Sequence, residues 1–103
     1  MEEVLNKKVI IRASRAGVFF GTLRDKQYTP AGVEVKLENS RRIWYWYGAA
    51  SLSQLATEGV KEPERCKFTV VVPSHIVEQV IEIIPCSEEA VKSIENVRVW
   101  RSN

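Results

Sequence analysis

The chain has 103 residues and a mass of 11.8 kDa, the size of one domain, so we expect a single domain over residues 1–103. Hydrophobic residues make up 45% of it and charged residues 27%, which excludes a disordered chain. The net charge of +2 is too small for a general nucleic-acid binder, and no apolar run approaches the roughly 20 residues of a membrane span.

The first half of the chain is predicted to form an antiparallel meander. β-Branched residues and polar–apolar alternation indicate three short strands, over Lys8–Ala13, Val18–Arg24 and Val33–Leu37. A loop that contains Pro30, over residues 26–32, separates the second of these strands from the third. A turn at residues 38–40 leads from the third strand to a fourth. That fourth strand is the aromatic run over residues 41–47.

The second half is predicted to add two short capped helices and further strands. Ser51 and Gln54 match a capping box at the start of the first helix, and Gly59 suits its end. Ser87 precedes an acidic first turn and caps the second helix. Strands are expected over Lys67–Val72, closed by Pro73, over Gln79–Ile84, closed by Pro85, and over Val97–Trp100. The predicted fold class is therefore mainly β (α+β), a small curled antiparallel sheet or an SH3/Sm-like barrel with two short helices.

Cysteine usage and the first residues favour the cytoplasm. Cys66 and Cys86 form at most one pair, which is a poor disulfide framework, so we expect reduced, buried thiols with a structural role. The segment over residues 1–8 begins with acids and lacks the apolar core of a signal peptide. A metal site is not expected, because His75 is the single histidine and no Cys-x-x-Cys occurs.

The aromatic run Arg41–Tyr47 holds two of the three Trp and two of the three Tyr. As a strand it would place Ile43, Tyr45 and Tyr47 on one face, and Arg42, Trp44 and Trp46 on the other. A small domain has one core, so one aromatic face should be exposed or lie in a subunit interface. The alternative is that both faces are covered, one by the core and the other by the following helix or a second subunit.

An anion site is the best supported chemistry. The first fifty residues carry nine Lys and Arg against five acids, and they include the aromatic run. Indoles stack on planar rings, guanidinium groups hold phosphate, and a helix start with small residues offers free N–H groups. The predicted ligand-binding residues are Arg41, Arg42, Trp44, Trp46, Gly48, Ala49 and Ser51.

Catalytic chemistry has little support in the sequence. It contains no Gly-x-Ser-x-Gly motif, phosphate-binding Gly-rich loop or metal-ligand cluster, and no cofactor is indicated. His75 is expected to be a loop histidine without a special role, and Glu78 and Glu82 to lie on a solvated strand face. We therefore expect a protein that is not an enzyme.

Most of the chain resembles a family of small tailed-phage proteins of unassigned function. The motifs that carry the resemblance are residues 42–46, 48–56, 58–60, 67–68, 80–86 and 97–100. It implies a phage or prophage accessory protein that acts in the bacterial cytoplasm. A weaker resemblance links Gly21-Thr22-Leu23 and residues 35–39 to the first motif of Sm-like barrels, whose rings bind RNA.

These features lead to a leading functional hypothesis and two alternatives. Several unrelated phage families sequester nucleotide signals of bacterial immunity, and by analogy we expect binding of a cyclic or dinucleotide without turnover. The alternatives are an Sm-like module for single-stranded RNA or DNA, and a module that docks on a host or phage protein. A homo-oligomer is expected, because an exposed face with Trp44 and Trp46 is large for a monomer.

Overall fold

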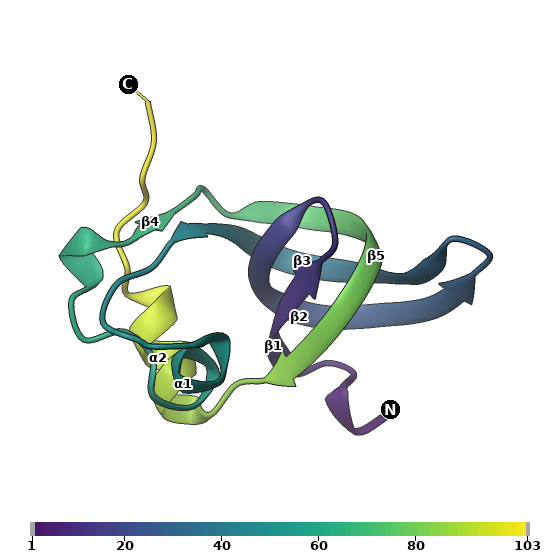
Figure 1. The fold of residues 1–103 in the computed structure, drawn as a ribbon, viewed down its shortest axis with the longest axis horizontal. Helices are drawn as coiled ribbons and strands as arrows, with labels where there is room; N and C mark the ends of the chain where they lie inside the picture. Colours follow the sequence, from purple (N-terminus) through teal and green to yellow (C-terminus); the bar gives the residue numbers. More distant parts are fainter. Residues whose placement is uncertain (1, 103) are drawn as a thin grey trace.

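The computed structural model describes residues 2–102 as one small α+β domain (Figure 1). Its elements in chain order are η1 (Glu2–Val4), β1 (Lys8–Ala13), β2 (Gly17–Thr29), β3 (Gly32–Tyr45), α1 (Leu52–Glu58), η2 (Pro63–Arg65), β4 (Lys67–Phe68), β5 (Val72–Pro85) and α2 (Glu88–Glu95). The predicted mainly β architecture with two short helices is confirmed.

Four antiparallel strands pair around a closed ring. β1 pairs with β2 and with β5, and β3 pairs with β2 and with β5, so each of these four strands has a partner on both sides. β4 adds to the end of β3 through the pair Ile43 and Phe68. The predicted meander is present, but it consists of three strands because residues 33–45 form one.

Two of the predicted breaks are wrong. Residues 26–29 continue β2, which turns only at Pro30 and Ala31. The predicted turn at residues 38–40 is an irregularity within β3, where Asn39 has a φ of 51°. Long-range pairing on both sides holds β3 extended through this point, which a local pattern cannot show.

The predictions for the later strands are also corrected. β4 covers only Lys67 and Phe68, and Pro73 lies inside β5, opposite Asn39 of β3. Pro73 is tolerated because β1 pairs further along β5, from Val80 onwards, so the ladder here is one-sided. The expected strand over residues 97–100 is a single parallel bridge between Phe68 and Val99.

Two hydrophobic clusters occupy the two faces of the strongly curved sheet. Alternate side chains of β1 separate them, with Val9 and Ile11 in one cluster and Ile10 in the other. The cluster that contains Ile10 also contains Leu55 of α1 and Ile94 of α2, because the two helices pack side by side against this face of the sheet (Figure 1). Within residues 2–102, no helix is long and apolar enough to cross a membrane.

Both predicted helix caps are confirmed. The Ser51 hydroxyl accepts a hydrogen bond from the Gln54 N–H at 3.1 Å, and α1 ends at Gly59. The Ser87 hydroxyl accepts from the Ala90 N–H at 3.0 Å and also donates to the Thr57 carbonyl at 2.6 Å. Ser87 therefore links the start of α2 to the end of α1.

Candidate functional site

The aromatic run does not keep the alternation that the sequence predicts. The β3–β4 register shifts between Ile43 and Tyr45, and β3 ends at Tyr45. Trp44 is 63% exposed and Tyr45 is 48% exposed, whereas Trp46 packs against the cluster beneath the helices. Trp44 and Trp46 therefore do not share an exposed face, because the strand ends before Trp46.

Arg41 has a structural role in the domain interior. It is 4% exposed, and its guanidinium donates hydrogen bonds to the carbonyls of Thr69, Ile94 and Phe68 at 3.0, 3.0 and 3.2 Å. Burial lowers the pKa of this guanidinium. Each of the three guanidinium nitrogens is thus bonded inside the domain, and Arg41 is not placed to hold a phosphate at the surface.

Arg42 is exposed, and its side chain lies over a ring of β2. Its guanidinium carbon is 4.7 Å from the centre of the Phe19 ring, and its backbone N–H donates to the Thr69 hydroxyl at 2.9 Å. Arg42 also affects His75, whose pKa is lowered by burial and by this nearby positive charge. The Arg42 guanidinium is therefore already in contact with the Phe19 ring.

The N–H groups at the start of α1, which the sequence predicts to bind an anion, donate hydrogen bonds within the protein. The side-chain oxygen of Gln54 accepts from the Ala50 N–H at 2.7 Å, and the Ser51 cap takes the Gln54 N–H. Gly48 has a φ of 90°, and a Cβ there would lie 2.8 Å from the Lys61 nitrogen. The small residues at 48–51 therefore serve chain packing around α1.

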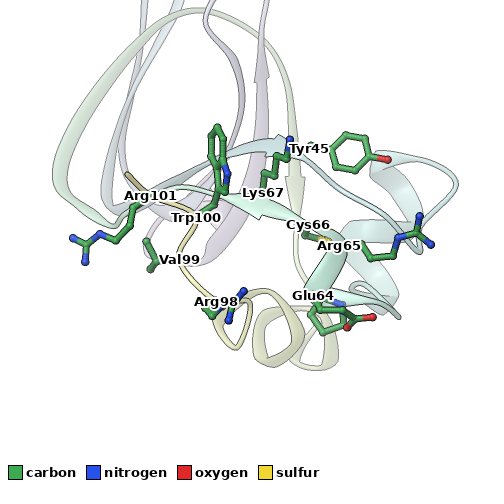
Figure 2. Close-up of a pocket in the computed structure, with 10 residues that line it drawn as sticks. Tyr45, Glu64, Arg65, Cys66, Lys67, Arg98, Val99, Trp100 and Arg101 are labelled. Atoms are coloured by element: carbon green, nitrogen blue, oxygen red, sulfur yellow. The ribbon is translucent and has the colours of Figure 1, made fainter. Parts of the chain in front are cut away.

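A cationic, aromatic-lined pocket lies beside the exposed end of β3 (Figure 2). It has a volume of about 790 Å³. The lining residues come from the end of β3, from η2 and β4, and from the segment after α2: Tyr45, Pro63, Glu64, Arg65, Cys66, Lys67, Arg98, Val99, Trp100 and Arg101. Four cationic side chains thus face one carboxylate, and none of the seven residues predicted from the sequence lines the pocket.

The cations are spread around the pocket and two of them lie on aromatic rings. The Arg65 guanidinium carbon is 3.9 Å from the centre of the Tyr47 ring, and Arg65 also pairs with Glu62 at 3.7 Å. Figure 2 shows Lys67 and Trp100 beside each other, and the Lys67 ammonium is 5.4 Å from the Trp100 ring centre. Cation–π contacts of this kind hold positive charge at a partly exposed surface.

Main-chain contacts place the segment after α2 against β4. The Trp100 N–H donates to the Phe68 carbonyl at 2.9 Å, next to the bridge between Phe68 and Val99. Arg41 stabilises this arrangement from the domain interior, because its guanidinium donates to the Phe68 carbonyl in β4 and to the Ile94 carbonyl in α2. The pocket therefore depends on contacts between segments that are distant in the sequence.

Ser40 and the two cysteines have packing roles, although Cys86 is only partly buried where the sequence predicts a buried thiol. Ser40 is fully buried and its hydroxyl is 3.0 Å from Nδ1 of His75, which lies in β5 and not in the predicted loop. Both thiols are free, and burial raises the pKa of Cys66 and raises that of Cys86 to about 12. Across residues 2–102, no group of three or more His, Cys, Asp or Glu side chains could hold a metal ion.

Sequence reasoning missed Lys67, Arg98 and Trp100 as site residues. The alternation over residues 97–100 was a usable signal, because an inward Val97 implies that Arg98 and Trp100 are exposed. The pattern does not show that Lys67 lies beside Trp100, because these two residues meet only where the segment after α2 contacts β4.

The fold and the pocket define a small antiparallel β domain with a basic, aromatic surface site. The chain belongs to the family described as a domain of unknown function, DUF6948, whose model matches residues 6–94. This match includes Tyr45 and the residues of η2 and β4, and it ends before Arg98. No curated protein and no solved structure matches the chain.

Proposed function

We propose that the protein binds a nucleotide-type ligand in the pocket between η2, β4 and residues 98–101, and that it does not turn the ligand over. The single observation that supports this most is the composition of the pocket, in which four cations and two exposed aromatic rings face one carboxylate. Guanidinium and ammonium groups suit phosphate, and Tyr45 and Trp100 offer faces for a planar base.

The site proposed here differs from the one predicted from the sequence, but its chemistry is the same. Arg65, Lys67 and Arg98 take the phosphate-binding role predicted for Arg41 and Arg42. Tyr45 and Trp100 take the stacking role predicted for Trp44 or Trp46. The pocket volume of about 790 Å³ is within the range of small-ligand sites.

The biological setting of the proposal comes from the resemblance to small tailed-phage proteins. We propose that the protein acts in the cytoplasm of an infected bacterium, where it sequesters a cyclic or dinucleotide signal of the host's defence. Sequestration needs tight binding and release of the ligand unchanged, which agrees with the buried positions of Ser40 and Cys66.

The test is calorimetry with a panel of mononucleotides, cyclic mononucleotides and cyclic dinucleotides. We expect micromolar or tighter binding of at least one member and at least a tenfold loss in Lys67→Ala and Arg98→Ala, since each removes a charge-assisted phosphate contact. Arg15→Ala is the matched control, because Arg15 is an exposed cation in the β1–β2 turn and does not line the pocket. Failure of the whole panel to bind would refute the proposal.

Two further measurements separate the proposal from its alternatives. Bound nucleotide recovered intact after heat denaturation of the protein indicates sequestration, and a hydrolysed product indicates an enzyme. Tighter binding of short RNA or DNA oligomers than of any nucleotide, with a steep salt dependence, would favour a single-stranded nucleic-acid binder instead.

A further inference from the structure

Two tryptophans from distant parts of the chain stand next to each other at the edge of the pocket. The ring centres of Trp44 and Trp100 are 6.5 Å apart, and the ring planes differ by 9°. They come from segments on opposite sides of β4, because β4 pairs with β3 on one side and contacts residues 99–100 on the other. Trp100 lines the pocket, so the indole pair continues the pocket outward.

The spacing of the two indoles suits an inserted ring. Carbon atoms in contact lie about 3.5–4 Å apart, so a planar ring held between two others needs about 7 Å between the outer rings. The ring centres of the two indoles are 6.5 Å apart and the rings are nearly parallel, so a small outward movement of these exposed side chains would admit a base. Trp44 is 63% exposed and Trp100 is 47% exposed, so packing in the core does not hold either ring in place.

A cation lies where the phosphate of such a ligand would be needed. Lys67 is on β4, between the segments that carry the two indoles, and its ammonium is 5.4 Å from the centre of the Trp100 ring. Arg98 and Arg101 also line the pocket, and they belong to the same segment as Trp100. A base between the indoles would therefore keep its phosphate next to positive charge.

We propose that Trp44 and Trp100 form an aromatic clip that takes one base of the ligand between them, while the adjacent phosphate lies in the pocket against Lys67. This inference rests on the proposed function and narrows its ligand class. The ligand carries a planar base close to a phosphate, and a polyphosphate without a ring uses the pocket alone.

The test compares two probes, a cyclic dinucleotide with 2-aminopurine in place of one base, and inorganic tripolyphosphate. Stacking between indoles should quench the 2-aminopurine fluorescence when the dinucleotide binds the wild-type protein. Trp44→Ala should weaken dinucleotide binding by about tenfold or more and remove the quenching, because a stacking surface is lost. Trp44→Phe should retain most of both effects, and tripolyphosphate binding should be unchanged in both variants.

Tyr28→Ala is the matched control, since Tyr28 is an exposed ring on β2 that does not line the pocket. The clip is refuted, and the proposed function stands, if Trp44→Ala binds and quenches the dinucleotide as the wild type does. It is also refuted if Trp44→Ala weakens tripolyphosphate equally, because Trp44 would then shape the pocket and not hold a base. Wild-type protein that binds neither probe refutes the clip, and the proposed function falls with it only if the whole nucleotide panel also fails to bind.

Discussion

Arg41 and Arg42 are neighbours in β3 with opposite roles. Successive side chains of a strand point to opposite faces, so one guanidinium enters the interior and the other remains at the surface. Arg41 bonds three main-chain carbonyls there, and Arg42 lies over the Phe19 ring. The sequence indicates that the two arginines differ, but the carbonyls that select Arg41 belong to β4, its following residue and α2, which no local pattern places nearby.

Replacing Arg41 with Met should lower the free energy of unfolding by about 3 kcal/mol, because it removes three buried hydrogen bonds from a charged donor. Arg42→Met is the matched control and should cost less than about 1 kcal/mol, because Arg42 is exposed. Chemical denaturation of both variants measures the difference. Equal losses would show that the three hydrogen bonds of Arg41 add no more stability than the contact of Arg42 with the Phe19 ring.

His75 should make stability depend on pH. Its pKa is lowered from 6.5 by burial and by Arg42, so below pH 6.5 the unfolded chain binds the proton more readily than the folded one. Stability should therefore be fully present above pH 6.5 and fall as the pH decreases from there towards the lowered pKa. Denaturation at pH 7 and pH 5 tests this, and His75→Asn should reduce the difference. A His75 pKa above 6.5 in an NMR titration would contradict it.

The two helix caps allow a prediction at the scale of elements. Ser51→Ala removes one hydrogen bond to a backbone N–H and should cost about 1 kcal/mol. Ser87→Ala should cost more, about 2 kcal/mol, because the Ser87 hydroxyl also donates to the Thr57 carbonyl at the end of α1. Thermal or chemical unfolding of the two variants gives the comparison. The order would be reversed if the link between the helices contributed nothing.

Elements with local signals were predicted well, and elements that depend on distant partners were not. The bounds of β1 and both caps follow from alternation and cap chemistry, which act within a few residues. The turn predicted at residues 38–40 and the break predicted at Pro73 have ordinary turn composition, yet they lie opposite each other in paired strands. The pocket residues were not predicted for the same reason. Lys67 and Trp100 lie together only because the segment after α2 contacts β4.

Exposed apolar side chains on the whole molecule predict self-association. Trp44, Val71 and Trp100 are each close to half exposed or more, and they belong to or flank β3, β4 and the segment after α2. Covering part of such a patch is favourable, so we expect a dimer or a higher ring in which the ligand pocket lies between subunits. Light scattering at tens of micromolar protein measures the mass. A value near 11.8 kDa would show that the patch remains open in a monomer.

Closure of the strand ring also has a consequence for how the chain folds. β1 and β2 meet through a short turn, but β1 meets β5 only across a long separation, as Arg12 and Glu82 show at 70 positions apart. Such non-local pairing slows folding, to milliseconds or seconds instead of microseconds. Until β5 arrives, β1 and β3 each expose an unpaired edge rich in apolar residues. The incomplete ring is therefore the form of this protein most prone to aggregation, although the finished one pairs all four strands on both sides.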